Sequence, residues 1–89
     1  MWDWDEQKRQ ANLAKHGVDF ADVASFDFLT AFIEPDTKKD YGELRQNALG
    51  LIGPRVYHLT FTMRGGLMRV ISLRKAKTRE QLRWVVSRK

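Results

Sequence analysis

Four cationic side chains in one short stretch are the residues of this sequence that most clearly could do chemistry. They are Arg69, Arg74, Lys75 and Lys77, within the segment Leu67–Lys77. The apolar and β-branched residues between them are typical of a buried strand. A packed strand holds guanidinium and ammonium groups in place, and fixed groups of this kind bind phosphate. The stretch therefore predicts a strand that positions cations against a phosphate.

Cations of this kind suit the cleavage of a phosphodiester bond in RNA, where the neighbouring 2′-hydroxyl can serve as the nucleophile. The protein then has to orient the substrate, move protons and stabilise charge on the phosphorane, and cations can do the last without a metal. Arginine is not a base at neutral pH. The proton would therefore be moved by another group, and the candidates are His16, His58, Lys15 or a carboxylate such as Glu43.

Other common kinds of catalytic site lack a pattern in this sequence. The two histidines, His16 and His58, are far apart, the chain has no cysteine, and no close Asp and Glu pair falls on one predicted strand. Gly65-Gly66 predicts a hairpin turn rather than a phosphate-binding loop. No serine or cysteine triad is visible either. We therefore expect neither a metal site nor a cofactor.

Length and charge bound the class of protein. A chain of 89 residues predicts one domain, residues 1–89. The formal net charge of +5 favours acidic partners such as nucleic acid, an anionic membrane surface or an acidic protein. The absence of cysteine fits a reducing compartment. Neither a signal peptide nor an apolar run of about 20 residues is present, so we expect a soluble cytoplasmic protein without a membrane partner.

The N-terminal part of the chain predicts two helices. Trp2–Trp4 suits a short extended lead-in, after which Asp3 or Asp5 can cap a helix that runs to about Lys15. Gly17 can end that helix in the left-handed conformation. Its only clearly apolar members are Ala11, Leu13 and Ala14. A second short helix is expected from Asp19.

The rest of the chain predicts four strands and a helix. The strands are expected at Leu29–Glu34, Glu43–Ile52, Arg55–Met63 and from Leu67 onward, the last three as a meander. Thr78 and Gln81 predict a capping box for a C-terminal helix that carries Leu82, Val85 and Val86. The fold class is therefore α+β, with two N-terminal helices, a four-stranded mainly antiparallel sheet and a C-terminal helix.

Alternation along the strands predicts one covered and one polar face of the sheet. Tyr57, Leu59, Phe61 and Met63 share the first face, whereas His58, Thr60 and Thr62 share the second with Arg45 and Asn47 from the preceding strand. In the last strand, strict alternation puts Arg69 and Arg74 on opposite faces, and only a bulge or an early strand end would bring them together. We expect Ser72 and Arg74 on the polar face.

Short motifs along nearly the whole chain resemble those of the BrnT toxins. They are Trp4-Asp5, Lys8, Asn12, Lys15-His16-Gly17 and Phe20, followed by Asp40-Tyr41-Gly42-Glu43, Arg45, Gly50, Thr62 and the run Arg69–Ala76. The resemblance implies a RelE-like fold and metal-independent RNA cleavage that inhibits translation and arrests growth. It also implies a bacterial host and neutralisation by a BrnA-type antitoxin that binds operator DNA.

The resemblance also suggests roles for individual residues. The polar motif positions of the family fall on Lys8, Lys15, His16, Arg45, Arg69, Ser72 and Arg74. Arg45 and Arg74 are expected to stabilise the phosphate, and His16 or Lys15 to transfer a proton or place the substrate. Further RNA contacts are expected from Lys8, Arg64, Arg69, Ser72, Lys75 and Lys77. The chain departs from the family at Phe61 and Met63, where Tyr and an acidic residue are common.

Two other functions fit the same composition. A basic domain could bind nucleic acid without cutting it, with Trp2, Trp4 or Tyr57 stacking on bases. An inactive homologue could serve as an antitoxin-binding regulator. The apolar segment Leu82–Val86 either packs on the sheet or forms a surface for the antitoxin or a second toxin copy in the complex.

Overall fold

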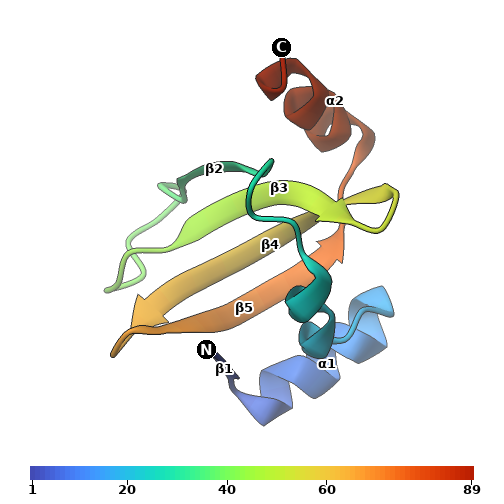
Figure 1. The fold of residues 1–89 in the computed structure, drawn as a ribbon. Helices are drawn as coiled ribbons and strands as arrows, with labels where there is room; N and C mark the ends of the chain where they lie inside the picture. Colours follow the sequence, from blue (N-terminus) through green and yellow to red (C-terminus); the bar gives the residue numbers. More distant parts are fainter.

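A computed structural model describes all residues, 1–89, as helices and strands around one sheet. In chain order the elements are β1 (Trp2–Trp4), α1 (Glu6–His16), the 3₁₀ helix η1 (Phe20–Ser25), β2 (Phe32–Pro35), β3 (Gln46–Ile52), β4 (Arg55–Arg64), β5 (Leu67–Lys75) and α2 (Thr78–Ser87). The strand order is β1-β5-β4-β3-β2, and only the β1–β5 pair is parallel. Figure 1 shows the sheet between α1 and η1 on one side and α2 on the other.

The predicted α+β class is confirmed, and so are the antiparallel meander and the C-terminal helix. Three expectations about the elements were wrong. The sheet has five strands because Trp2–Trp4 pairs with Met68–Val70. The second helix is a single 3₁₀ segment, capped by the Asp19 side chain. The strand expected from Leu29 begins only at Phe32, and the Leu29 side chain is 97% exposed.

Helix α1 begins and ends as the sequence predicts. The Asp5 carboxylate accepts hydrogen bonds from the backbone N–H groups of Gln7 and Lys8. At the other end, Gly17 adopts a φ of 69° and its N–H donates to the carbonyl of Leu13. This left-handed conformation favours glycine, and it turns the chain toward η1.

A polar residue, Asn12, attaches α1 to the sheet. Strand β1 covers β5 only as far as Val70, so the edge of β5 around Leu73 has no partner strand. The Asn12 amide takes the place of one: its Nδ2 donates to the Leu73 carbonyl at 2.7 Å and to the Val18 carbonyl at 3.0 Å. The Leu73 N–H donates back to Asn12 Oδ1 at 3.4 Å. Asn12 is the buried residue of α1, whereas its apolar residues Ala11, Leu13 and Ala14 are exposed.

The main core lies between the sheet and η1. Its buried members are Val18, Phe20, Val23, Phe26, Ala48, Leu59, Phe61, Val70 and Leu73. Trp4 packs against this cluster, with its ring 6.3 Å from that of Phe20. The prediction that Leu59 and Phe61 face helices is therefore confirmed.

Helix α2 covers only one end of the opposite sheet face. A smaller cluster of Leu49, Val56 and Ala76 lies there, and Trp84 packs on it while its Nε1 donates to the Thr30 carbonyl at 3.1 Å. Leu82, Val85 and Val86 are 60%, 43% and 69% exposed. Of the two alternatives for the segment Leu82–Val86, packing on the sheet holds for Trp84, whereas Leu82, Val85 and Val86 point outward.

The start of α2 also differs from its prediction. The helix begins at Thr78, but the cap is made by Glu80, whose Oε1 accepts the backbone N–H of Lys77 at 2.8 Å. Gln81 instead donates to the carbonyl of Ala76. Neither α1 nor α2 is long and apolar enough to cross a membrane.

Candidate functional site

A β-bulge in β5 determines which residues of that strand share a face. Thr60 pairs with Ser72, whereas the next residue, Phe61, pairs with Val70. Ile71 is therefore the extra residue on β5. At this residue the alternation of side chains between the two faces of the sheet shifts by one position. The bulge explains how Val70 and Leu73, three positions apart, both enter the same core.

The same bulge brings the two arginines of β5 to one face. Arg74 lies opposite His58, and Arg69 lies opposite Thr62, while His58 and Thr62 are on the same side of β4. Strict alternation had predicted opposite faces for Arg69 and Arg74. The expectation that Ser72 accompanies Arg74 on this face is confirmed, since Ser72 lies opposite Thr60.

Three neighbouring strands contribute the residues that we call the polar face. They are Asn47 from β3, His58 and Thr60 from β4, and Ser72 and Arg74 from β5. The Thr60 hydroxyl donates to Asn47 Oδ1 at 2.8 Å, which fixes the orientation of the amide. These residues lie next to the end of the sheet that α2 covers.

Glu80 of α2 joins Arg74 and His58 into one charged group. Arg74 Nη1 and Nη2 donate to the two oxygens of Glu80 at 2.8 and 3.0 Å. Arg74 lowers the pKa of Glu80 to about 2, so this carboxylate is ionised at neutral pH. His58 Nε2 lies 3.9 Å from Glu80 Oε2. Burial, and then the charge of Arg74, lower the pKa of His58, which keeps its imidazole neutral at neutral pH.

The Arg74–Glu80 pair should make stability depend on acid pH. Because the folded-state pKa of Glu80 lies below its model value of 4.5, its contribution is complete above that value and is lost as the pH falls toward about 2. We expect E80Q to lower the melting temperature by about 5 °C at pH 7. Circular dichroism melts should show this difference from the wild type disappearing near pH 2. A difference that is constant with pH would contradict the role of the pair.

A cavity of about 240 Å³ adjoins the polar face. It lies between the sheet, the end of β2 with the following turn, and α2. Its lining includes Phe32, Glu34, Asn47, His58, Glu80 and Arg83.

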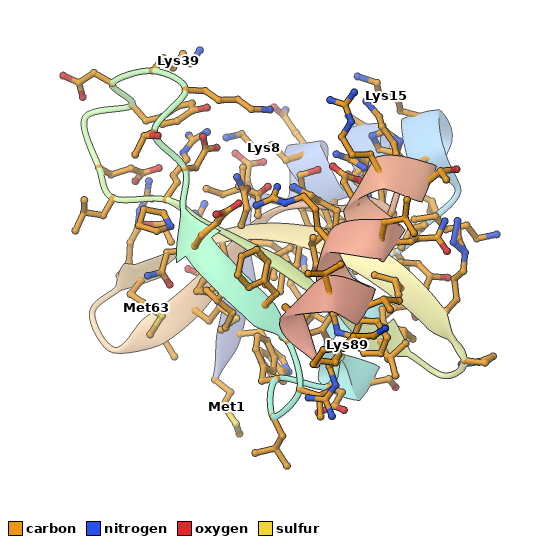
Figure 2. All side chains as sticks on the ribbon, turned by 90° about the horizontal axis from the view of Figure 1, so that it is seen from above. Met1, Lys8, Lys15, Lys39, Met63 and Lys89 are labelled. Atoms are coloured by element: carbon orange, nitrogen blue, oxygen red, sulfur yellow. The ribbon has the colours of Figure 1, made fainter.

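The predicted residues of α1 lie beside Arg74. Desolvation, and then the charges of Lys15 and Arg74, lower the pKa of His16, whose side chain is exposed. Figure 2 shows Lys8 and Lys15 along one side of the molecule, the side that also carries Lys39. Asn12 lies one helical turn before His16 and binds Leu73, the residue before Arg74, so the C-terminal end of α1 lies against the edge of β5 near Arg74.

The other predicted cations lie toward the opposite end of the sheet. Gln46 pairs with Phe61, which places Arg45 level with Thr62 and about 13 Å along the strand direction from His58. Arg45 Nε lies 3.1 Å from Glu43 Oε2, and its guanidinium stacks 4.1 Å from the centre of the Tyr41 ring.

Two more of these cations also have carboxylate partners. Arg64 binds Glu43 at 2.9 Å, and Arg69 binds Asp3 at 2.7 Å. The candidate residues thus form two groups, one around Arg74 and one around Arg45 and Glu43. The expected RNA contacts Lys75 and Lys77 follow Arg74 along the chain and are exposed.

Sequence reasoning missed Glu80 and left His58 as one of several proton carriers. The alternation of His58 with Thr60 and Thr62 was a sufficient signal for its face. No local pattern placed Glu80 against Arg74, because their contact depends on where α2 docks. The chain contains no group of three or more His, Cys, Asp or Glu side chains that could hold a metal ion.

The fold and the polar face describe a small basic α+β protein with cations gathered at one sheet edge. Residues 4–80 match the family model of the ribonuclease toxin BrnT of type II toxin–antitoxin systems. The chain belongs to this family, as its motifs indicated. No curated protein sequence matches the chain closely. Membership implies RNA as the substrate and a cognate antitoxin as the partner.

Proposed function

We propose that this toxin, of RelE-like fold, cleaves RNA on the polar face without a metal, inhibits translation and growth, and is neutralised by a BrnA-type antitoxin. The observation that carries the proposal is the group around Arg74. A guanidinium fixed by Glu80 lies near the end of α1 that carries Lys15 and the exposed His16. Each of the tasks of RNA cleavage has a suitable side chain there.

The reaction that fits this group is an internal transesterification. The 2′-oxygen attacks the phosphorus, the bond from phosphorus to the 5′-oxygen breaks, and the products are a 2′,3′-cyclic phosphate and a 5′-hydroxyl. The 2′-hydroxyl gives its proton to a base, and the leaving 5′-oxygen gains a proton from the protonated base or from water. Negative charge gathers on the phosphorane oxygens, where a cation stabilises it.

Arg74 stabilises that charge. Its guanidinium has five N–H donors, of which Glu80 and the Lys75 carbonyl take three. Two donors remain for a phosphate, so Glu80 orients the guanidinium without occupying all of it.

His16 is the proton acceptor in this scheme, and Lys15 places the substrate. The lowered pKa of His16 keeps its imidazole neutral at pH 7, the form that can take a proton. Arg45, further along the same face, holds the RNA beyond the scissile bond. Its stacking on Tyr41 keeps the guanidinium in place.

Expression in a bacterial host tests the proposal. The wild-type chain should arrest growth and create new RNA 5′ ends, and the double variant R45A/R74A should do neither. The variant must accumulate as a folded protein, which circular dichroism verifies. A folded double variant that is fully toxic would exclude this site. No arrest and no new ends from the wild type would favour a non-catalytic nucleic-acid-binding or regulatory protein.

A further inference from the structure

The cavity beside the polar face has the size and lining of a site for one planar polar group. Its volume of about 240 Å³ is below the range of roughly 300–1,000 Å³ for pockets that hold drug-sized ligands. Phe32, Pro35 and Leu49 supply apolar wall, and Glu34 and Asn47 supply hydrogen-bonding groups. A single nucleobase combines flat apolar faces with a polar edge in the same way.

Two groups in the lining keep unused hydrogen-bonding capacity. Glu34 binds Arg83 through Oε1, and its Oε2 has no hydrogen-bond partner. Asn47 accepts the Thr60 hydroxyl at Oδ1, and its Nδ2 donors have no partner. The cavity therefore offers a carboxylate acceptor and an amide donor, each held by the neighbour that occupies its other end.

We propose that this cavity is a guanine-binding pocket that selects the RNA bound on the polar face. The inference rests on the proposed function. Guanine presents N1–H and N2–H₂ side by side, and the free Oε2 of Glu34 has lone pairs to accept from both, while O6 next to them can accept from the free Nδ2 of Asn47. Adenine and cytosine place a ring lone pair beside their amino group, and uracil places its single N–H between two carbonyls. Each of these three bases turns a lone pair toward Glu34.

The location of the cavity connects base selection with cleavage. His58 and Glu80 line it, and Glu80 also holds Arg74. A base seated in the cavity therefore lies one side chain away from the guanidinium that binds the phosphate. Binding of the correct base would place the phosphate of that nucleotide, or of the adjacent nucleotide, at Arg74.

Calorimetric titration of the purified chain with GMP, AMP, CMP and UMP tests the pocket. GMP should bind about 10-fold or more tightly than the other three, because hydrogen bonds to a charged group discriminate strongly. E34Q should lose most of that preference. Asp22, an exposed carboxylate on η1, supplies the matched control: D22N makes the same charge change and should keep the preference.

A nucleotide variant makes the test independent of protein folding. Inosine monophosphate lacks the N2 amino group, so it should bind the wild type several-fold more weakly than GMP. Equal affinity for all four nucleotides, or preference for another base, would overturn the pocket even if the toxin cleaves RNA. GMP preference without new RNA ends in cells would leave the pocket standing and overturn the ribonuclease proposal.

Discussion

Replacement of Arg74 by alanine should lower the rate of RNA cleavage by about 100- to 1,000-fold, as expected when a group that stabilises transition-state charge is removed. Arg74 donates two hydrogen bonds to the Glu80 carboxylate, so the charge is fixed before the substrate arrives. R74K should recover part of the rate, since lysine keeps the charge without the planar set of donors. Initial rates on a labelled RNA measure the effect.

The control for this variant is R79A. Arg79 is an exposed cation on the outer side of α2, beside Leu82 and Val86. R79A removes the same charge from the chain and should leave the rate within about twofold, because exposed charges act weakly over distance. An R74A protein that folds and cleaves as fast as R79A would exclude Arg74 from the reaction.

Replacement of Asn12 by alanine should lower the free energy of unfolding by about 2 to 4 kcal/mol. The substitution leaves the Val18 carbonyl and both backbone groups of Leu73 without their partner, and unpaired buried polar groups are costly. N12D should cost at least as much, because a carboxylate cannot donate to the two carbonyls. Urea unfolding followed by circular dichroism measures both.

Gln10 provides the matched control on the same helix. Its amide is exposed and binds only Glu6, at 2.8 Å. Q10A should therefore change the free energy of unfolding by less than about 0.5 kcal/mol. Equal effects of N12A and Q10A would mean that the Asn12 amide does not hold α1 on β5.

The limits of prediction are clearest where a contact joins distant parts of the chain. The alternation of Trp2 and Trp4 with Asp3 suggests extended backbone, but its partner strand at Met68–Val70 lies almost at the other end of the sequence. Because the two strands pair in parallel, no hairpin turn connects them, and the sequence between them carries no turn residues that would indicate the pairing. The sheet was therefore predicted one strand too small, although the antiparallel meander, which carries turn residues, was predicted correctly.

Helix α1 shows how an apolar pattern can mislead. The only clearly apolar residues of the predicted helix were alanine and leucine, but the helix docks on the unpaired edge of a strand, where peptide groups need hydrogen bonds. An amide satisfies them and an apolar side chain does not. Asn12 is thus the buried residue, and it stood in the sequence only as part of a motif.

The sequence could show which arginines and lysines are candidates for the site, but not which of them lie together in the fold. The sequence indicated that Arg69 and Arg74 would need a bulge to share a face, and it could not show that Ile71 forms one. It also could not show that Glu43 binds Arg64, Asp3 binds Arg69 and Glu80 binds Arg74, because each carboxylate comes from another part of the chain. The register of the strands and the docking position of the helices decide these contacts. Both depend on the tertiary structure and leave no local pattern in the sequence.

The chemistry of the RNA ends produced in a bacterial translation extract tests the central claim most directly. Purified wild-type chain should generate new fragments that carry a 5′-hydroxyl and a 2′,3′-cyclic phosphate, since the 2′-oxygen is the nucleophile in the proposed reaction. Labelling with a kinase that needs a free 5′-hydroxyl detects them. Fragments with 5′-phosphate ends, or no fragments from a folded chain, would contradict cleavage by the polar face.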